Sequence, residues 1–294
     1  MRVAAIIPSR GHDILLAGAL DALAAQELPI AEVVVVDDSP DASILLDRDV
    51  TLLRSRGKGP YAARELAWRS VDADVYLFLD ARSRPLPTWA GSVTALFEDP
   101  EVSIGGSDIK VTGGSTAAAR AAVLEQPFRV TSYVDEPWFM SYVPTCNLAV
   151  RRSALESVGG FSAVRSGGDA DFCWRVQLDG GRLAVVPSVQ MEWIPRTDIR
   201  SYLEQHYRYG TSRYALSRAW VDRGASPAPV PTLPQIGRRT ATLTAKLGWA
   251  ALRLRRDRLL WQLVEAGRIA TRLGTWQAAR QACRVADDGS VSRP

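Results

Sequence analysis

The first hundred residues alternate between two patterns of apolar and polar positions. Short, continuous apolar runs occupy residues 3–8, 32–36, 50–53 and 75–79. Apolar residues at helical spacing occupy residues 13–26 and 60–70. Continuous apolar runs are typical of strands buried on both faces, and helices between them connect parallel strands. The pattern therefore predicts an α/β fold, with a mostly parallel central sheet flanked by helices.

The second half of the chain is less regular up to residue 146. Beyond it, the pattern predicts strands at 147–152 and 183–186 and helices at 153–158 and 198–220. Four prolines between residues 225 and 234 are typical of a linker. We therefore expect an α/β domain over 1–222, a linker over 223–235, a helical extension over 236–285 and a flexible tail over 286–294.

Composition restricts the class of protein. The chain has 294 residues, 47% of them hydrophobic, and a net charge of +4 from dispersed arginines, which does not favour nucleic-acid binding. We expect no signal peptide, and no apolar run approaches the roughly 20 residues that span a bilayer. The three cysteines have no metal-binding spacing and are expected to be buried thiols. These features together favour a cytoplasmic protein.

Polar residues follow three of the predicted strands, as Pro8-Ser9-Arg10, Asp37-Asp38 and Asp80-Ala81-Arg82. In a parallel sheet such ends face the ligand crevice. The sequence lacks the glycine fingerprints of dinucleotide-binding proteins and P-loop enzymes. Carboxylates bind a nucleotide through its base and ribose, or reach its phosphates through a divalent cation. The strand ends therefore favour a nucleotide-sugar enzyme, and a sugar-phosphate nucleotidyltransferase is the less favoured alternative.

A pair of carboxylates stands in the segment Gly167-Gly168-Asp169-Ala170-Asp171, ahead of a helix-compatible run. Asp169 is a candidate general base, and Asp171 can orient it or bond to Arg175. Aspartates at this spacing also cap helices, so the segment alone is a weak signal.

Seven segments in register resemble family 2 of the inverting glycosyltransferases, which have the GT-A fold. They are IIPSR, VVVVDDSPD, GKGPYAARELAW, VYLFLDARSRP, TCNLAVRRSALESVGGF, GGDADFCWRV and YLEQHYRYG, within residues 1–215. The resemblance implies transfer of a sugar, most often from a UDP-sugar, to a hydroxyl acceptor with inversion. Saccharides and lipid-linked molecules are the acceptor classes it implies, in glycan or natural-product biosynthesis.

The resemblance also implies roles for the donor-side residues. Pro8 and Arg10 would line the nucleotide-base pocket, and Asp37 and Asp38 would contact base and ribose. The alternative for the acidic pair is a turn in which Asp38 caps the chain before a proline. Arg64 would lie near the donor, with a solvated helix charge as its alternative.

On the acceptor side, Asp169 matches the catalytic base and Asn147 matches a strand beneath the acceptor. Trp174 would either wall the acceptor pocket or pack in the core. Asp80 matches the first aspartate of the metal-binding D-x-D. A non-catalytic nucleotide-sugar-binding or scaffold protein is the alternative to an enzyme.

The chain departs from the family pattern at three positions. Arg82 stands in place of the second aspartate, Gly168 in place of a glutamate, and Met191 near the place of a histidine ligand. Methionine is a poor ligand for magnesium or manganese. Either Asp80 alone holds a divalent cation, or Arg82 or a neighbouring arginine supplies the positive charge. His206 is expected on a helix surface.

Residues 236–285 are rich in arginine and contain Trp249 and Trp261. Basic helices that carry tryptophan bind anionic membrane surfaces. Packing on the catalytic domain or on a second copy of the chain is the alternative. The first reading places the protein at the inner face of the membrane.

Overall fold

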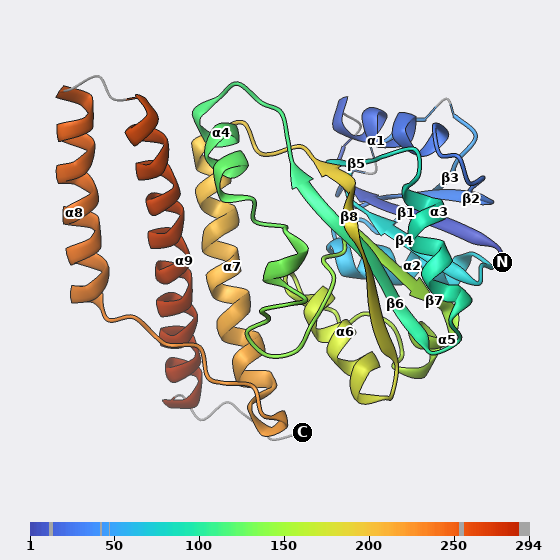
Figure 1. Ribbon diagram of the computed structural model, residues 1–294. Coiled ribbons are helices and arrows are strands. Elements are labelled where there is room, and N and C mark those ends of the chain that lie inside the picture. The colour runs from blue at the N-terminus through green and yellow to red at the C-terminus, as the bar shows by residue number, and fades with distance from the viewer. Residues whose placement is uncertain (12–13, 42, 47, 253–255, 288–294) are drawn as a thin grey trace. The chain divides into compact units, whose positions relative to one another are not determined.

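The computed structural model describes residues 1–11, 14–41, 43–46, 48–252 and 256–287. Its strands are β1 (Val3–Ser9), β2 (Glu32–Asp37), β3 (Thr51–Arg54), β4 (Val75–Leu79), β5 (Ser83–Pro85), β6 (Val102–Val111), β7 (Asn147–Arg151) and β8 (Arg182–Trp193). In the described part of the chain they form one sheet in the order β3-β2-β1-β4-β7-β6-β8-β5 (Figure 1).

Helices accompany the strands in the alternation that the sequence predicts. They are α1 (Ile14–Ala24), α2 (Pro60–Ser70), α3 (Trp89–Ala95), α4 (Ala117–Glu125), α5 (Arg152–Ser157), α6 (Gly168–Leu178), α7 (Ile199–Ala219), α8 (Leu233–Leu252) and α9 (Arg256–Asp287). Short 3-10 turns lie at Leu96–Glu98, Val130–Ser132 and Val221–Arg223. The α/β class is confirmed.

The strands β1 to β4 form one set of parallel neighbours, which aligns their carboxyl ends, and β6 and β8 form a second parallel pair. β1 pairs with β2 and β4, and β2 pairs with β3, all in parallel, whereas β7 is antiparallel to both β4 and β6. The register places Ser9 opposite Asp37 and Asp37 opposite Arg54. The polar strand ends therefore meet at one edge of the sheet, as expected of a parallel sheet.

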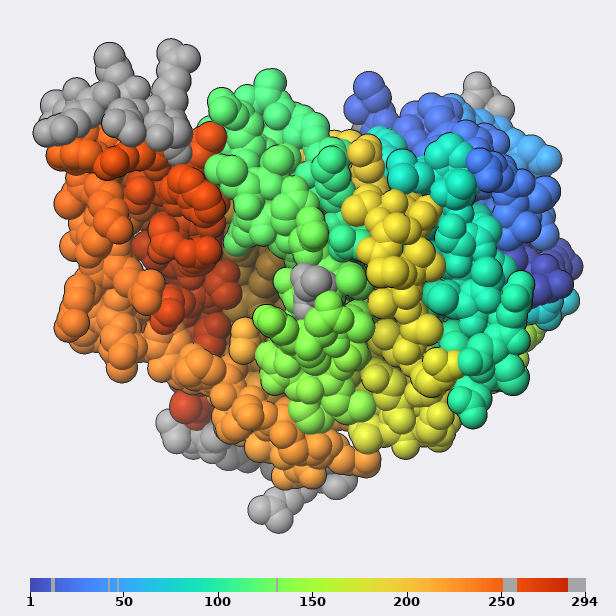
Figure 2. Space-filling view, in the orientation of Figure 1, coloured from blue at the N-terminus to red at the C-terminus, as the bar shows by residue number. Residues whose placement is uncertain are grey.

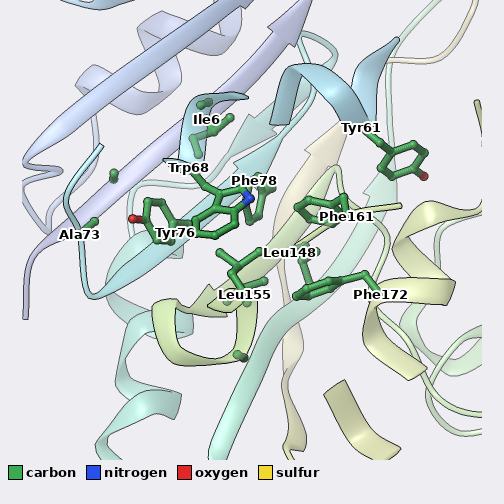
Figure 3. Close-up of a cluster of buried hydrophobic side chains, with 14 of the residues drawn as sticks. Ile6, Tyr61, Trp68, Ala73, Tyr76, Phe78, Leu148, Leu155, Phe161 and Phe172 are labelled. Atoms are coloured by element: carbon green, nitrogen blue, oxygen red, sulfur yellow. The ribbon is translucent and has the colours of Figure 1, made fainter. Parts of the chain in front are cut away.

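A large apolar cluster fixes α2, α5 and α6 against one face of this sheet (Figure 3). Phe78 on β4 contacts Phe161 edge to face with ring centroids 5.1 Å apart, and Phe161 packs on Phe172 of α6 at 4.6 Å. Tyr61 lies at the margin of the cluster, and its hydroxyl points away from the Trp68 and Tyr76 rings. The core thus ties together the two helices, α2 and α6, on which the candidate site depends.

The strand β6 was not expected, and β8 runs well beyond the predicted residues 183–186. Gly105 and Gly106 interrupt the apolar pattern of β6, which hides the strand in the sequence. A Cβ added at Gly106 would lie 2.5 Å from Cγ1 of Val143 and 3.0 Å from the carbonyl oxygen of Asn147. Glycine is therefore required at position 106 because Val143 and Asn147 approach its backbone closely, and not because the chain turns there.

The chain divides into two compact units. One comprises residues 1–112 and 126–194 and contains the sheet, and the other comprises residues 113–125 and 195–294. The domain bounds expected from the sequence remain predictions. The helical extension is present as α8 and α9, whereas residues 253–255 and 288–294, which include most of the expected tail, lie outside the described residues. Among the described residues, no helix combines the length and hydropathy needed to cross a bilayer.

Two expectations about single residues in this part of the chain are wrong. His206 is buried, not on a helix surface, because its Nε2 lies 3.1 Å from Oε2 of Glu125 on α4 and its ring packs on Tyr202. Cys283 is exposed, while Cys146 and Cys173 are buried as expected.

Candidate active site

Asp37 ends β2 and fastens the loop that follows it. It is fully buried, its Oδ1 accepts the backbone N–H of Ser39 at 2.8 Å, and its Oδ2 accepts that of Ile44 at 2.8 Å. Burial acts to raise the pKa of Asp37, but the hydrogen bonds from Ser39 and Ile44 outweigh it and hold the pKa below its usual range. Asp37 therefore shapes this edge of the sheet as an ionised brace.

Asp38 connects the same edge to the start of α2. Its Oδ1 accepts the hydroxyl of Ser55 at 2.7 Å and the N–H of Gly59 at 3.0 Å. Gly59 has φ of 99°, which favours glycine, and Pro60 begins α2 directly after it. Nε of Arg10, whose side chain is largely exposed, lies 3.8 Å from Oδ2 of Asp38. The carboxylates of Asp37 and Asp38 therefore both accept hydrogen bonds from the protein itself. Arg10 is a solvent-exposed cation beside Asp38.

Arg64 on α2 forms an ion pair with Asp80 at the end of β4. Nη2 of Arg64 lies 2.6 Å from Oδ1 of Asp80; the arginine side chain is 2% exposed and the aspartate side chain 40% exposed. Nε of Arg64 is buried without a hydrogen-bond partner among the described residues. The carboxylate that the resemblance assigns to a metal is therefore already paired with a buried guanidinium.

Asp169 lies in the first turn of α6, which begins at Gly168 after Gly167 in a left-handed conformation. Its Oδ1 accepts the N–H of Ala170 at 3.0 Å, and its Oδ2 faces the N–H of Thr145 at 3.4 Å. Desolvation by burial raises the pKa of Asp169, although these backbone hydrogen bonds and the charge of Arg64 oppose the rise. A carboxyl group with a raised pKa is better matched to proton abstraction near neutral pH.

Tyr61 is a site residue that the sequence did not reveal. It is buried, and its hydroxyl acts on Asp169 in the direction that lowers the pKa of that carboxyl group. The guanidinium carbon of Arg64 lies 5.5 Å from the centroid of the Tyr61 ring. Tyr61 and Arg64 are three residues apart and share one face of α2, so their spacing was the available signal.

The second carboxylate of the α6 segment has the bracing contact expected of it. Oδ2 of Asp171 lies 3.0 Å from Nε of Arg175 and accepts the hydroxyl of Ser162 at 2.6 Å. Arg175 also donates to the carbonyl oxygens of Val158 and Gly160, each at 2.8 Å. This pair joins the start of α6 to the loop before it.

Two residues expected near the acceptor are enclosed by protein. Asn147 is fully buried, accepts Nε1–H of Trp89 at 2.6 Å and donates to Ser107. Trp174 is also fully buried and donates to the carbonyl oxygen of Met140 at 2.8 Å. These contacts favour the scaffold alternative for Asn147 and the core alternative for Trp174.

Among the described residues, the side chains around Asp80 do not fit a divalent-cation site. Nη1 of Arg82 donates to the carbonyl oxygen of Ile194 at 3.2 Å, and its guanidinium lies near the ring of Trp193. Met191, near the place of the family histidine, is fully buried. No group of three or more His, Cys, Asp or Glu side chains that could hold a metal occurs in the described part of the chain. Asp80 is the remaining carboxylate of the pattern, and Arg64 competes for it.

A family model for glycosyl transferase family 2 matches residues 5–159, which is more than half of the chain and includes the strand ends described above. The chain belongs to glycosyltransferase family 2. Pre-mycofactocin glycosyltransferases from two Mycobacterium tuberculosis strains are 30% identical to it over 205 residues. The match covers 66% of this chain but only 44% of those relatives, so the chain spans less than half of their length.

The likeness to solved structures supports the GT-A fold. The mannosyltransferase PcManGT from Pyrobaculum calidifontis, in complex with GDP-Man and Mn²⁺, aligns with a TM-score of 0.61, 20% identity and coverage of 93% of this chain and 86% of that one. S. aureus TarS 1–349 aligns with a TM-score of 0.50, 14% identity and coverage of 100% and 93%. At these identities the likeness concerns the fold alone.

Proposed function

We propose that this glycosyltransferase moves a sugar from a nucleoside diphosphate sugar to a hydroxyl acceptor, with Asp169 as the general base. The observation that carries the proposal is the position of Arg64. This buried cation is paired with Asp80 at a strand end on the nucleotide side and acts electrostatically on Asp169 on α6. Asp80 and Asp169 are therefore linked through Arg64.

The reaction is a single displacement. The carboxylate of Asp169 takes the proton of the acceptor hydroxyl while that oxygen forms a bond to the anomeric carbon. The bond from the anomeric carbon to the phosphate oxygen breaks, and the nucleoside diphosphate leaves with the electron pair from the opposite face. Configuration inverts, and a positioned base of this kind contributes about 10²–10⁴-fold to the rate.

Donor binding is assigned to the edge formed by β1, β2 and β4. On this assignment the base and ribose bind beside Pro8, Asp37 and Asp38. The contacts of Asp37 with the backbone of Ser39 and Ile44 hold the loop after β2. A UDP-sugar is the first donor to test. GDP-mannose is the second, because PcManGT was solved with GDP-Man.

Positive charge for the leaving diphosphate is assigned to arginine. Arg10 is exposed at the nucleotide edge, and Arg82 replaces a carboxylate that would bind a cation. Guanidinium groups bind phosphate through two hydrogen bonds and stay charged. Arg64 already neutralises the charge of Asp80, so this carboxylate would bind a divalent cation weakly. We therefore expect the transferase activity to depend only weakly on metal.

The acceptor side is assigned to residues 133–146, which end beside Asp169. Trp138 and Phe139 in this segment are partly exposed and pack edge to face on Trp174, with ring centroids 5.2 and 5.0 Å away. Thr145 near the end of the segment faces Asp169. Partly exposed aromatic rings anchored on a buried tryptophan offer a rigid apolar surface for a sugar or lipid-linked acceptor.

A panel of nucleotide sugars tests the proposal. Each donor is added with manganese or with chelator, and the shift in Tm and the release of nucleoside diphosphate are measured. A donor present at one hundred times its Kd stabilises the native state by about 2.7 kcal/mol. Binding without release in the presence of diverse acceptors would favour the non-catalytic alternative. Release of pyrophosphate from a nucleoside triphosphate and a sugar phosphate would favour a nucleotidyltransferase.

A further inference from the structure

The helices α8 and α9 enclose a basic groove outside the proposed active site. Its volume is about 440 Å³. Arg238, Arg239 and Lys246 line it from α8, and Gln262, Glu265 and Arg272 line it from α9. The space-filling view shows α8 exposed along its length, in orange (Figure 2). Twenty residues of α8 include no aspartate or glutamate.

The cations of this groove are not neutralised within the described part of the chain. None of Arg238, Arg239, Lys246 and Arg272 forms an ion pair there, and Glu265, the acidic lining residue, is paired with Arg268. Oε1 of Gln262 is buried and has no hydrogen-bond partner among the residues that the structure describes, so its amide group is also available to reorient. Four like charges around one groove repel one another, and an anion between them would relieve that repulsion.

Two exposed tryptophans lie on the helices that line the groove, Trp249 on α8 and Trp261 on α9. Trp249 follows Lys246 by three residues and therefore lies on the same stripe of α8. The guanidinium of Arg258 on α9 lies 4.7 Å from the centroid of its ring. Trp249 is 41% exposed and Trp261 on α9 is 51% exposed. Exposed tryptophan beside arginine is the combination that binds the interface of an anionic membrane.

We propose that the α8–α9 groove binds the phosphate head groups of an anionic lipid surface, with Trp249 and Trp261 at the level of the head groups. Arginine, lysine and amide side chains donate to phosphate oxygens, and the groove is large enough for a head group. The proposal concerns attachment, and it does not depend on which sugar the enzyme transfers.

Vesicle co-sedimentation of the full chain tests this. We expect binding to vesicles of phosphatidylcholine with phosphatidylglycerol at low salt, release at high salt, and no binding to phosphatidylcholine alone. In the variant R238Q/R239Q/K246Q the partition coefficient should fall about a hundredfold, because each surface cation contributes about fivefold. The control R218Q/R223Q/R284Q removes three exposed charges outside the groove and should bind as the wild type does. An unchanged Tm confirms that each variant is folded.

Several results would overturn the lipid assignment. These are equal loss in both triple variants, binding to neutral vesicles, or no binding by the wild type. Two more would reassign the groove to another occupant: a groove-dependent Tm shift with free pyrophosphate but no vesicle binding, or a groove-dependent increase in mass without vesicles, which indicates a second copy. Donor binding and nucleoside diphosphate release are measured separately, so a failure here leaves the proposed function unaffected.

Discussion

The ring of Tyr61 occupies the space that a side chain at position 168 would need. A Cβ added at Gly168 would lie 2.9 Å from both Cδ1 and Cε1 of Tyr61, and the hydroxyl of the same tyrosine acts to lower the pKa of Asp169. Gly168 stands where the family pattern has a glutamate. The absence of a side chain at Gly168 therefore makes room for the Tyr61 ring, which lies next to the first turn of α6, where the proposed base is located.

Gly168→Ala should destabilise the fold by about 1–3 kcal/mol, because the buried Tyr61 ring has to move. Urea unfolding measures the change. Gly91→Ala is the control, since a Cβ there meets Leu28 at an ordinary 3.9 Å. Combining Gly168→Ala with Tyr61→Leu should cost less than the sum of the two single variants. Additive costs would show that the two positions do not share this space.

Tyr61→Phe should move the acid limb of the activity profile to higher pH. Asp169 faces the Tyr61 hydroxyl and Arg64 from α2, and the backbone N–H groups of Ala170 and Thr145. Burial is the largest influence and raises the pKa of Asp169, whereas the hydrogen bond from Tyr61 lowers it. Its removal raises the pKa further, so the base is ionised only at higher pH.

The pH dependence of kcat/KM measures this shift. The control is Tyr76→Phe, which removes another buried hydroxyl, one that bonds to the carbonyl oxygen of Val71 at 2.7 Å. Tyr76→Phe should lower Tm without moving the acid limb. An acid limb that stays in place in Tyr61→Phe would remove Tyr61 from the site.

The first half of the fold could be predicted because its signals are local. Continuous apolar runs such as Val75–Leu79 are buried along their whole length, and the acidic strand ends follow them directly. β6 could not be predicted, because Gly105 and Gly106 serve contacts with Phe97 and Val143 that only the fold creates.

The sequence indicated the candidate carboxylates but not the residues that contact them. Motif order indicated Asp80 and Asp169, and the structure supplied the ion pair of Asp80 with Arg64. The influence of Tyr61 on the pKa of Asp169 links two residues that are more than one hundred positions apart in sequence. Asn147 and Trp174 are buried by residues that are far away in sequence, such as Trp89 and Met140. The sequence alone therefore could not decide between an acceptor-site role and a structural role for either residue.

A chelator should leave most of the transferase activity intact. Arg64 holds Asp80 at 2.6 Å, and the other expected ligands are replaced, so a cation would meet one carboxylate that is already paired. Manganese should raise the Tm of the free wild type no more than that of Asp80→Asn. Activity that is abolished by chelator and restored by manganese would contradict this prediction.

Asp37→Asn should destabilise the protein by about 1–3 kcal/mol at neutral pH, because an amide cannot accept from both backbone N–H groups. The pKa of Asp37 is lowered in the folded state, so its contribution is present above the usual carboxyl pKa. It is lost as pH falls through the lowered value.

Urea unfolding at neutral and acidic pH measures this contribution. Asp37→Asn should show a weaker loss of stability in acid than the wild type. Exposed Asp49→Asn is the control and should change stability by less than about 0.5 kcal/mol. Equal acid sensitivity of Asp37→Asn and the wild type would exclude the bracing role.

Asp169→Asn provides the most direct test of the proposed general base. Nucleoside diphosphate release should fall by about 10²–10⁴-fold, while the Tm shift produced by the donor is retained. Burial raises the pKa of Asp169, so the ionised carboxylate destabilises the folded state at pH values above that pKa. The neutral Asp169→Asn variant should therefore have a higher Tm than the wild type at neutral pH. Release at the wild-type rate by a folded, donor-binding Asp169→Asn protein would contradict the account.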